Sequence, residues 1–112
     1  MESSIEAKFK IQLKAYQIGF KQEVMLIPGR RFKFDFLIEN TNLVIEIQGG
    51  TWARKKSGHN SGVGIRRDCE KSNLAQAHGL IIFKFTSDMI ISGEAIAFLC
   101  EYLNSKGANY AR

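Results

Sequence analysis

Residues 31–48 read RFKFDFLIENTNLVIEIQ, and this stretch decides the fold. Its first six positions alternate charged residues with phenylalanine, and its second half is rich in β-branched side chains. Between these halves, residues 39–42 (ENTN) are typical of a turn. The pattern predicts a β-hairpin whose two strands run over 31–38 and 43–48.

The register of this hairpin separates an apolar face from a mixed one. With the turn centred in 39–42, Asp35 lies opposite Glu46, and Lys33 lies opposite Gln48 on the same mixed face. The other face is wholly apolar and is expected to pack on a layer of helices. Its residues are Phe34, Phe36, Ile38, Leu43, Ile45 and Ile47.

The opposed carboxylates of Asp35 and Glu46 indicate a metal site. Their Cβ atoms are expected about 4.5–5.5 Å apart, and like charges so placed destabilise a strand pair. A hard divalent cation such as Mg²⁺ takes carboxylate oxygens as ligands and relieves this repulsion. Two alternatives remain open: Lys33 neutralises the pair, or the whole face is simply solvated.

The rest of the chain places helices around this hairpin. Ser3 and Glu6 form a capping box that opens a helix, and Gly19 ends it. The other expected elements are a strand over 21–27, a loop over 49–65, a helix over 66–78, a strand over 80–85 and a helix over 88–104. The last strand follows a helix, so it joins the sheet by a crossover. The expected fold is mixed α/β in the order αβββαβα, a single domain over 1–112 with a four-stranded mixed sheet flanked by helices.

The net charge favours a polyanionic partner. The chain has 16 lysines and arginines against 11 acidic residues, a net charge of +5 on 112 residues. Neither an apolar run of membrane-spanning length nor a secretory leader is visible. Cys69 and Cys100 have no disulfide or zinc spacing, and we expect two buried thiols in a reducing compartment, the cytoplasm.

Most of the excess charge lies in residues 54–71, directly after the second hairpin strand. A basic, glycine-rich loop beside paired carboxylates predicts contacts with nucleic-acid phosphates, and Trp52 is a candidate for stacking on a base. The candidate nucleic-acid-binding residues are Lys33, Trp52, Arg54, Lys55, Lys56, His59, Arg66 and Arg67. The alternative is a solvated loop with Trp52 folded onto the core.

The motif formed by Asp35 and the following Glu46-Ile47-Gln48 resembles that of the restriction-endonuclease-like PD-(D/E)XK nucleases. The expected element order is similar to the common core of that superfamily. Within it, the chain looks most like small single-domain enzymes related to very-short-patch-repair and phage-encoded endonucleases. The Gly-Gly pair after Gln48 and the run Arg-Asp…Lys…Leu…His-Gly-Leu-Ile-Ile at 67–82 carry this closer resemblance.

The resemblance implies a metal-binding role for Asp35 and Glu46, with Mg²⁺ or Mn²⁺ as the cofactor. Superfamily members often add an acidic residue from the first helix, and Glu6 fits that place. The backbone carbonyl of Ile47 is the remaining candidate ligand. Glu6 is equally well explained as the capping residue of its helix, and the two roles are compatible.

The superfamily's lysine position falls on Gln48, which is a departure from the pattern. A glutamine orients water by hydrogen bonding but brings no positive charge. Lys71 on the following helix, or Lys33 across the hairpin, would supply that charge. Phe34 stands where the superfamily has proline.

The sequence therefore predicts a Mg²⁺-dependent DNA endonuclease in which Asp35, Glu46, Gln48 and Lys71 act on the phosphodiester. A domain of this size covers little DNA, so cutting both strands predicts a homodimer, while a monomer that nicks or works within a larger assembly is the alternative. Cutting at junctions, flaps or mismatches is favoured over sequence-specific restriction. The competing hypothesis is a non-catalytic nucleic-acid-binding module on a nuclease fold, and a weaker one is an interaction protein with a basic surface.

Overall fold

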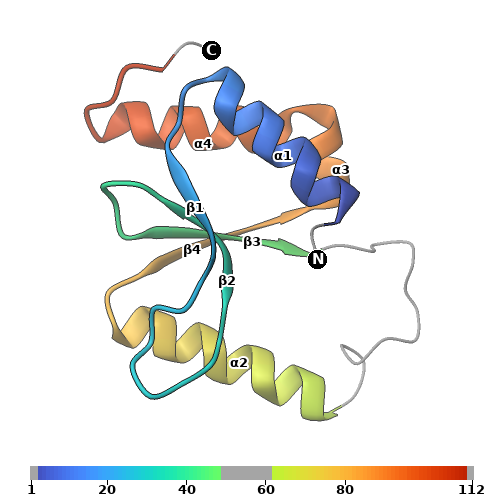
Figure 1. Ribbon diagram of the computed structural model, residues 1–112, viewed down its shortest axis with the longest axis vertical. Helices are drawn as coiled ribbons and strands as arrows, with labels where there is room; N and C mark the ends of the chain where they lie inside the picture. The colour runs from blue at the N-terminus through green and yellow to red at the C-terminus, as the bar shows by residue number, and fades with distance from the viewer. Residues whose placement is uncertain (1–2, 49–61, 111–112) are drawn as a thin grey trace.

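A four-stranded sheet lies at the centre of the computed structural model, which describes residues 3–48 and 62–110 (Figure 1). In chain order its elements are α1 (Ser4–Ala15), β1 (Phe20–Val24), β2 (Phe34–Ile38), β3 (Leu43–Gln48), α2 (Gly62–Ala77), β4 (Ile81–Thr86), α3 (Ser87–Ser92) and α4 (Glu94–Ser105). Helices α1, α3 and α4 cover one face of the sheet, and α2 covers the other (Figure 1). This arrangement confirms the expected mixed α/β fold with a sheet flanked by helices.

The strands lie in the order β1-β2-β3-β4. The pairs β1–β2 and β2–β3 are antiparallel, whereas β3 and β4 are parallel because α2 forms the crossover between them. The expected hairpin register is confirmed by the pairs Phe36↔Ile45 and Leu37↔Val44. The mixed sheet is confirmed as well.

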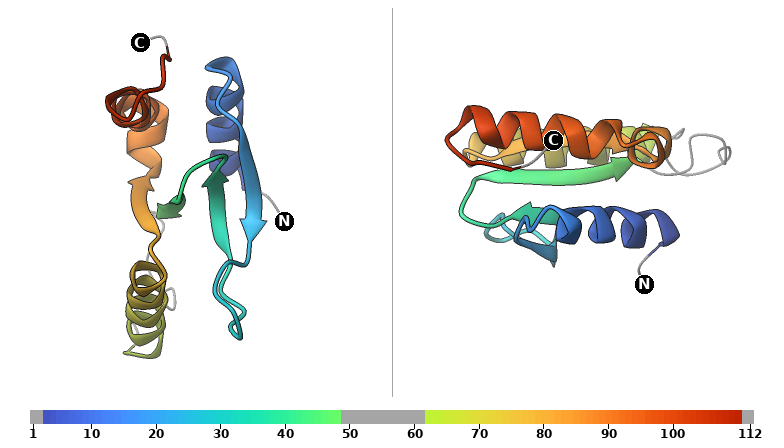
Figure 2. Two further views of the ribbon diagram at one scale, coloured as in Figure 1. Left: turned by 90° about the vertical axis from the view of Figure 1, so that its left-hand side faces the viewer. Right: turned by 90° about the horizontal axis from the view of Figure 1, so that it is seen from above.

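The elements fall into two groups, which we call halves, and one apolar core spans both of them (Figure 2). Helix α1 lies beside β1 and β2, and helices α2 and α4 lie beside β3 and β4 (Figure 2). The seam between the halves runs along the β2–β3 hairpin. Both Asp35 and Glu46 lie on this seam, so residues from both halves can reach them.

The single helix expected over 88–104 is wrong, because the structure has two helices there. Gly93 ends α3 with a left-handed φ of 87° and precedes the first residue of α4. Glycine adopts this conformation without the steric cost that a Cβ imposes. The apolar periodicity continues through the break, which is why the sequence alone predicted one helix.

Several element boundaries also differ from expectation. Helix α1 ends at Ala15, before the expected Gly19, and strand β1 ends at Val24, not at residue 27. Strand β2 begins at Phe34, and residues 31–33 lie outside the ladder with the turn that contains Pro28. Helix α2 begins at Gly62, earlier than the expected 66, so residues 62–65 are helical and not part of a loop. The first four residues of α2 are two glycines, which are poor helix formers, and two exposed apolar residues, so this first turn has no helical signal in the sequence.

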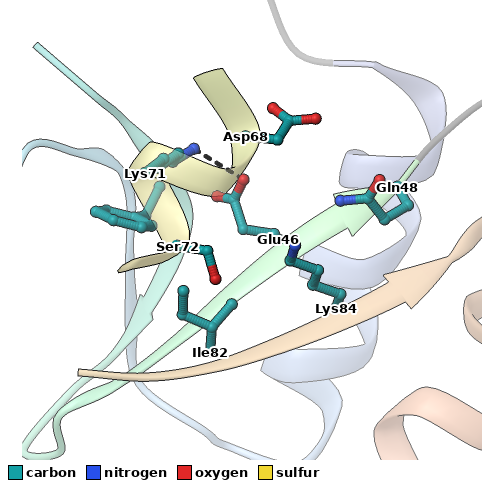
Figure 3. Close-up of a pocket in the computed structure, with 8 residues that line it drawn as sticks. Glu46, Gln48, Asp68, Lys71, Ser72, Ile82 and Lys84 are labelled. Carbon is teal, nitrogen blue, oxygen red and sulfur yellow. Dashed lines mark hydrogen bonds and ion pairs between the residues drawn. The ribbon is translucent and has the colours of Figure 1, made fainter. Parts of the chain in front are cut away.

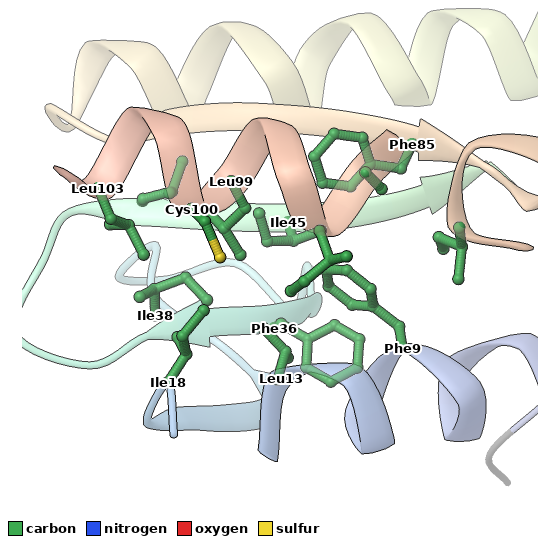
Figure 4. Packing of buried hydrophobic residues seen from close by; sticks show 14 residues of the cluster. Phe9, Leu13, Ile18, Phe36, Ile38, Ile45, Phe85, Leu99, Cys100 and Leu103 are labelled. Atoms are coloured by element: carbon green, nitrogen blue, oxygen red, sulfur yellow. The ribbon is translucent and has the colours of Figure 1, made fainter. Parts of the chain in front are cut away.

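The larger core lies beneath α1, α3 and α4 (Figure 4). Phe36 and Ile45 from the hairpin meet Phe9 and Leu13 from α1, and Leu99 comes from α4. The rings of Phe9 and Phe36 pack edge to face with their centroids 5.5 Å apart, a favoured geometry for aromatic pairs. This packing holds α1, and with it the side chain of Glu6, against the sheet.

A smaller apolar cluster lies beneath α2 and corrects the expected face of Phe34. Its buried residues are Ile27, Phe34, Val44 and Ala75. Phe34 therefore does not share a face with Phe36, and the β1–β2 ladder skips one pair between these residues without a change of register. Glu23, at the interruption, has a positive φ of 53°, and the backbone changes direction there.

The cysteine expectation is half wrong. Cys100 is buried in the larger core, whereas Cys69 is exposed on α2. Among the described residues, no helix combines the length and apolar character needed to cross a membrane.

Candidate functional site

Three carboxylates meet beside the seam, where α1, β1 and β2 of one half approach one another. Glu6 comes from the first turn of α1, Glu23 from β1 and Asp35 from β2. One oxygen from each lies within 4.8 Å of the other two, and Glu6 is only 9% exposed. Three oxygen ligands at such separations suit a hard divalent cation, which prefers carboxylates to nitrogen or sulfur ligands.

Glu6 also caps its own helix, as the sequence predicts. Its backbone N–H donates to Ser3 Oγ at 3.1 Å, and its Oε1 accepts from the Ser3 N–H at 3.0 Å. This capping box holds the glutamate side chain at the start of α1. The capping role is therefore confirmed, and the same side chain belongs to the carboxylate cluster.

Glu23 is a member of the cluster that sequence reasoning missed. Its left-handed backbone costs about 1–2 kcal/mol for a residue with a Cβ, and such strain is typical of functional positions. A signal for it exists in the sequence. A hairpin turn at Pro28-Gly29 places Glu23 opposite Asp35, by the same reasoning that places Asp35 opposite Glu46.

Asp35 and Glu46 are joined by a reciprocal pair of hydrogen bonds between side chain and backbone. The Asp35 N–H donates to Glu46 Oε2 at 3.0 Å, and the Ile47 N–H donates to Asp35 Oδ2 at 2.8 Å. These bonds stand where the β2–β3 ladder has ended. Each carboxylate is therefore positioned by the backbone of the opposite strand.

Burial raises the pKa of the Asp35 carboxyl above its usual range, against the lowering effect of the Ile47 N–H. The negative charges of Glu46 and Glu23 also raise this pKa, and the Lys71 ammonium lowers it. Burial is the largest of these influences, so the charged form of Asp35 is disfavoured in the folded protein. A cation bound among the carboxylates would favour that charged form.

Lys71 reaches from α2 to the seam, as the sequence analysis anticipates (Figure 3). Its Nζ donates to Glu46 Oε1 at 2.8 Å, and the two side chains are only 18% and 16% exposed. The same ammonium donates to the backbone carbonyl of Lys33 and lies 4.7 Å from the centre of the Phe34 ring. Lys71 is therefore the partner of Glu46, and the expectation that Lys33 neutralises the carboxylates with its ammonium is not met.

Glu46 and Lys71 form one wall of a small hollow between α2 and the sheet, which we call the α2 hollow (Figure 3). Its polar lining residues are Glu46, Gln48, Asp68, Lys71, Ser72 and Lys84. Gln48 is exposed at the end of β3. Lys84, on β4, is a second residue that sequence reasoning missed, because only the parallel pairing of β3 with β4 brings it beside Glu46.

The structure places the predicted nucleic-acid-binding residues in two groups. Arg66 and Arg67 are exposed on α2, and Lys33 is exposed just before β2. The other candidates, Trp52, Arg54, Lys55, Lys56 and His59, lie outside the described residues. Arg66 and Arg67 thus lie on the helix that supplies Lys71, and Arg66 lines a separate hollow with Cys69, Glu70 and Asn73.

The fold is similar to one solved structure, described as the catalytic domain of the homing endonuclease I-Bth0305I. The two chains are 17% identical and superpose with a TM-score of 0.65 over 89% of this chain and 92% of the other. No known family profile matches the chain, and no curated protein matches it. At this identity the likeness establishes a shared fold.

Proposed function

We propose that this protein is a metal-dependent DNA endonuclease that hydrolyses phosphodiester bonds. The observation that carries the proposal is the meeting of Glu6, Glu23 and Asp35 beside the Glu46–Lys71 pair. The fold shared with a homing endonuclease catalytic domain supports a nuclease, and the net charge of +5 supports a polyanionic substrate.

The oxygen ligands of the seam fit a divalent cation, Mg²⁺ or Mn²⁺. Glu6, Glu23 and Asp35 would hold it, with Glu46 next to them and the carbonyl of Ile47 as the further ligand expected from the sequence. A bound cation of this kind neutralises phosphate charge and lowers the pKa of water.

The chain's own side chains would orient the reactants around that centre. The Ile47 N–H holds the Asp35 carboxylate, and Lys71 holds Glu46, so neither carboxylate has to be ordered when substrate arrives. Gln48, exposed beside them, offers an amide that positions a water by hydrogen bonding. Lys71 would offset the charge of Glu46 beside the attacked phosphate.

The DNA would lie across α2 and the seam. Arg66 and Arg67 would contact the phosphate backbone, as would the basic residues expected from the sequence between 52 and 59. A domain this small holds one carboxylate cluster among its described residues. Cutting both strands would therefore need two copies, and we propose a homodimer on DNA.

A second candidate is a nucleic-acid-binding module that has lost catalysis. Both oxygens of Glu46 are already engaged, one by Lys71 and one by the Asp35 N–H, and position 48 carries no charge. Under this alternative the protein binds DNA in a salt-dependent way but does not cut it.

Cleavage assays separate these two candidates. Plasmid and branched DNA are incubated with wild type, Asp35→Asn and Glu46→Gln in Mg²⁺ or Mn²⁺. The nuclease proposal predicts cleavage by wild type and a loss of about a thousandfold or more in each variant, with DNA affinity little changed. Retained DNA binding without cleavage by wild type in either metal would favour the binding module.

Metal binding is tested separately by thermal unfolding. Mg²⁺ at ten times its dissociation constant should stabilise wild type by about 1.4 kcal/mol. Glu23→Gln should remove this stabilisation, whereas Glu101→Gln, an exposed control on α4 with the same change of charge, should retain it. Equal metal responses in the two variants would exclude Glu23 as a ligand.

A further inference from the structure

Lys84 lies on the central part of β4, beside the site but on the other half of the molecule. It is the register partner of Glu46 in the parallel β3–β4 pair. Partners in a sheet point to the same face, so Lys84 joins Ile82 on the α2 side. Its side chain lines the α2 hollow together with Glu46 and Gln48 (Figure 3).

The two lysines of the α2 hollow are in different states. The ammonium of Lys71 already donates hydrogen bonds to the Glu46 carboxylate and to the Lys33 carbonyl. Lys84 is exposed, and within residues 3–48 and 62–110 its ammonium has neither a hydrogen-bond nor an ion-pair partner. A lysine in this state can accept an incoming anion without giving up an existing contact.

A phosphodiester approaching the seam meets mostly negative charge. Four carboxylates lie on or next to the seam, those of Glu6, Glu23, Asp35 and Glu46. The phosphodiester adds negative charge, which increases in the transition state. A positive group that is free to contact the substrate is needed in addition to any bound metal. Of the lysines that line the α2 hollow, Lys84 is the one in that state.

We propose that Lys84 binds a phosphate of the DNA strand at the cleavage site and supplies the positive charge that Gln48 lacks. This assignment rests on the proposed nuclease function and adds a substrate-binding residue to it. Gln48 pairs with Thr86, two residues beyond Lys84, so residues 48 and 84 are diagonal neighbours on one face of the sheet. A lysine introduced at position 48 would therefore reach the same space.

The test compares Lys84→Met with Lys14→Met. Lys14 is exposed in the last turn of α1 and does not line the α2 hollow, so both variants lose one positive charge. Lys84→Met should lower kcat/KM for plasmid cleavage about 10- to 100-fold, the factor expected for one charge-assisted hydrogen bond. Lys84→Arg should restore most of this loss, and Lys14→Met should cleave like wild type.

Salt dependence gives a readout that a merely structural role would not change. In the Asp35→Asn background, Lys84→Met should reduce the slope of log affinity against log salt by about 0.9, the value for one phosphate contact on duplex DNA. Adding Gln48→Lys to Lys84→Met should restore both the slope and, in the active background, cleavage.

The outcomes separate this assignment from the proposed function. If wild type cleaves DNA and Lys84→Met matches Lys14→Met in both rate and salt slope, the Lys84 assignment fails while the nuclease proposal stands. If wild type neither binds nor cleaves DNA, the nuclease proposal fails, and the Lys84 assignment fails with it. A lower melting temperature of Lys84→Met with an unchanged salt slope would show a structural role and also overturn the assignment.

Discussion

The two faces of the sheet are built differently. Under α1, α3 and α4, fourteen of the described residues form one buried apolar cluster, whereas only four do so under α2. Helix α2 contributes a single buried residue, Ala75, although it is the longest of the described helices. The first face is held by apolar packing, and the second leaves room for charged side chains.

A small domain can place charged groups on the face of its sheet that has fewer buried apolar residues. The Glu46–Lys71 pair is mostly buried, yet it lies on the thinly packed face and is completed by hydrogen bonds to the backbone. Burial of charge is tolerated when each group has a partner. The well-packed face meanwhile holds α1 rigidly, so Glu6 reaches the seam without disturbing the core.

Matched leucine truncations on the two faces provide the largest test of this comparison. Leu99 is fully buried in the larger core, and Leu74 on α2 is half-buried against the smaller cluster. Leu99→Ala should lower the free energy of unfolding by about 3–5 kcal/mol, and Leu74→Ala by about 1–2 kcal/mol. Urea unfolding measures both values, and equal losses would contradict the contrast between the faces.

Removal of Lys71 tests whether the α2 face depends on its ion pair. Lys71→Met leaves the Glu46 carboxylate mostly buried without its cation, and should cost about 2–3 kcal/mol of unfolding free energy. The double variant Lys71→Met/Glu46→Gln removes both charges and should recover more than half of that loss. A double variant no more stable than Lys71→Met alone would show that the lysine acts through packing on Phe34.

The smallest expected effect concerns Asp35 and pH. Because burial raises the Asp35 pKa in the folded protein, the folded state holds the proton more tightly than the unfolded chain. Stability without metal should therefore fall as pH rises from the unfolded aspartate pKa through the higher folded one. Asp35→Asn removes this dependence and keeps an oxygen that accepts from the Ile47 N–H.

Metal-free Asp35→Asn should consequently melt above wild type at pH 7, and the difference should vanish below the aspartate range. Thermal unfolding across pH, with a chelator present, measures both. A variant that melts below wild type at every pH would mean that the asparagine amide costs more than the carboxylate charge. Under that outcome the raised pKa has no consequence for stability.

Local pattern predicted much of this protein. The hairpin register follows from the turn and from alternation, and the capping box at Ser3 and Glu6 follows from two residues three apart. Lys71 was a candidate because it is basic and lies on the helix after the hairpin. The break at Gly93 has no signal in the apolar spacing, which continues through it, because only the backbone of Gly93 differs by adopting a left-handed conformation.

The site itself needed pairings between distant strands. The position of the Glu23 carboxylate depends on the β1–β2 register and on a positive φ that the residue type does not predict. The side chain of Phe34 lies on the α2 face next to the same missing pair of the ladder. Lys84 depends on the parallel β3–β4 pairing across a crossover helix. Of these three positions, Glu23 has a signal in the sequence, the turn at Pro28-Gly29, whereas the faces of Phe34 and Lys84 have no local pattern.

The hairpin register and the helix cap depend on contacts between residues near in the chain, and local pattern predicts both. Packing of the sheet brings Glu23 to the other carboxylates, pairs Lys71 with Glu46 and places Lys84 beside them. The physical reason is that a charge's role is set by its neighbours within a few ångströms. Those neighbours come from elements that only the packed sheet brings together.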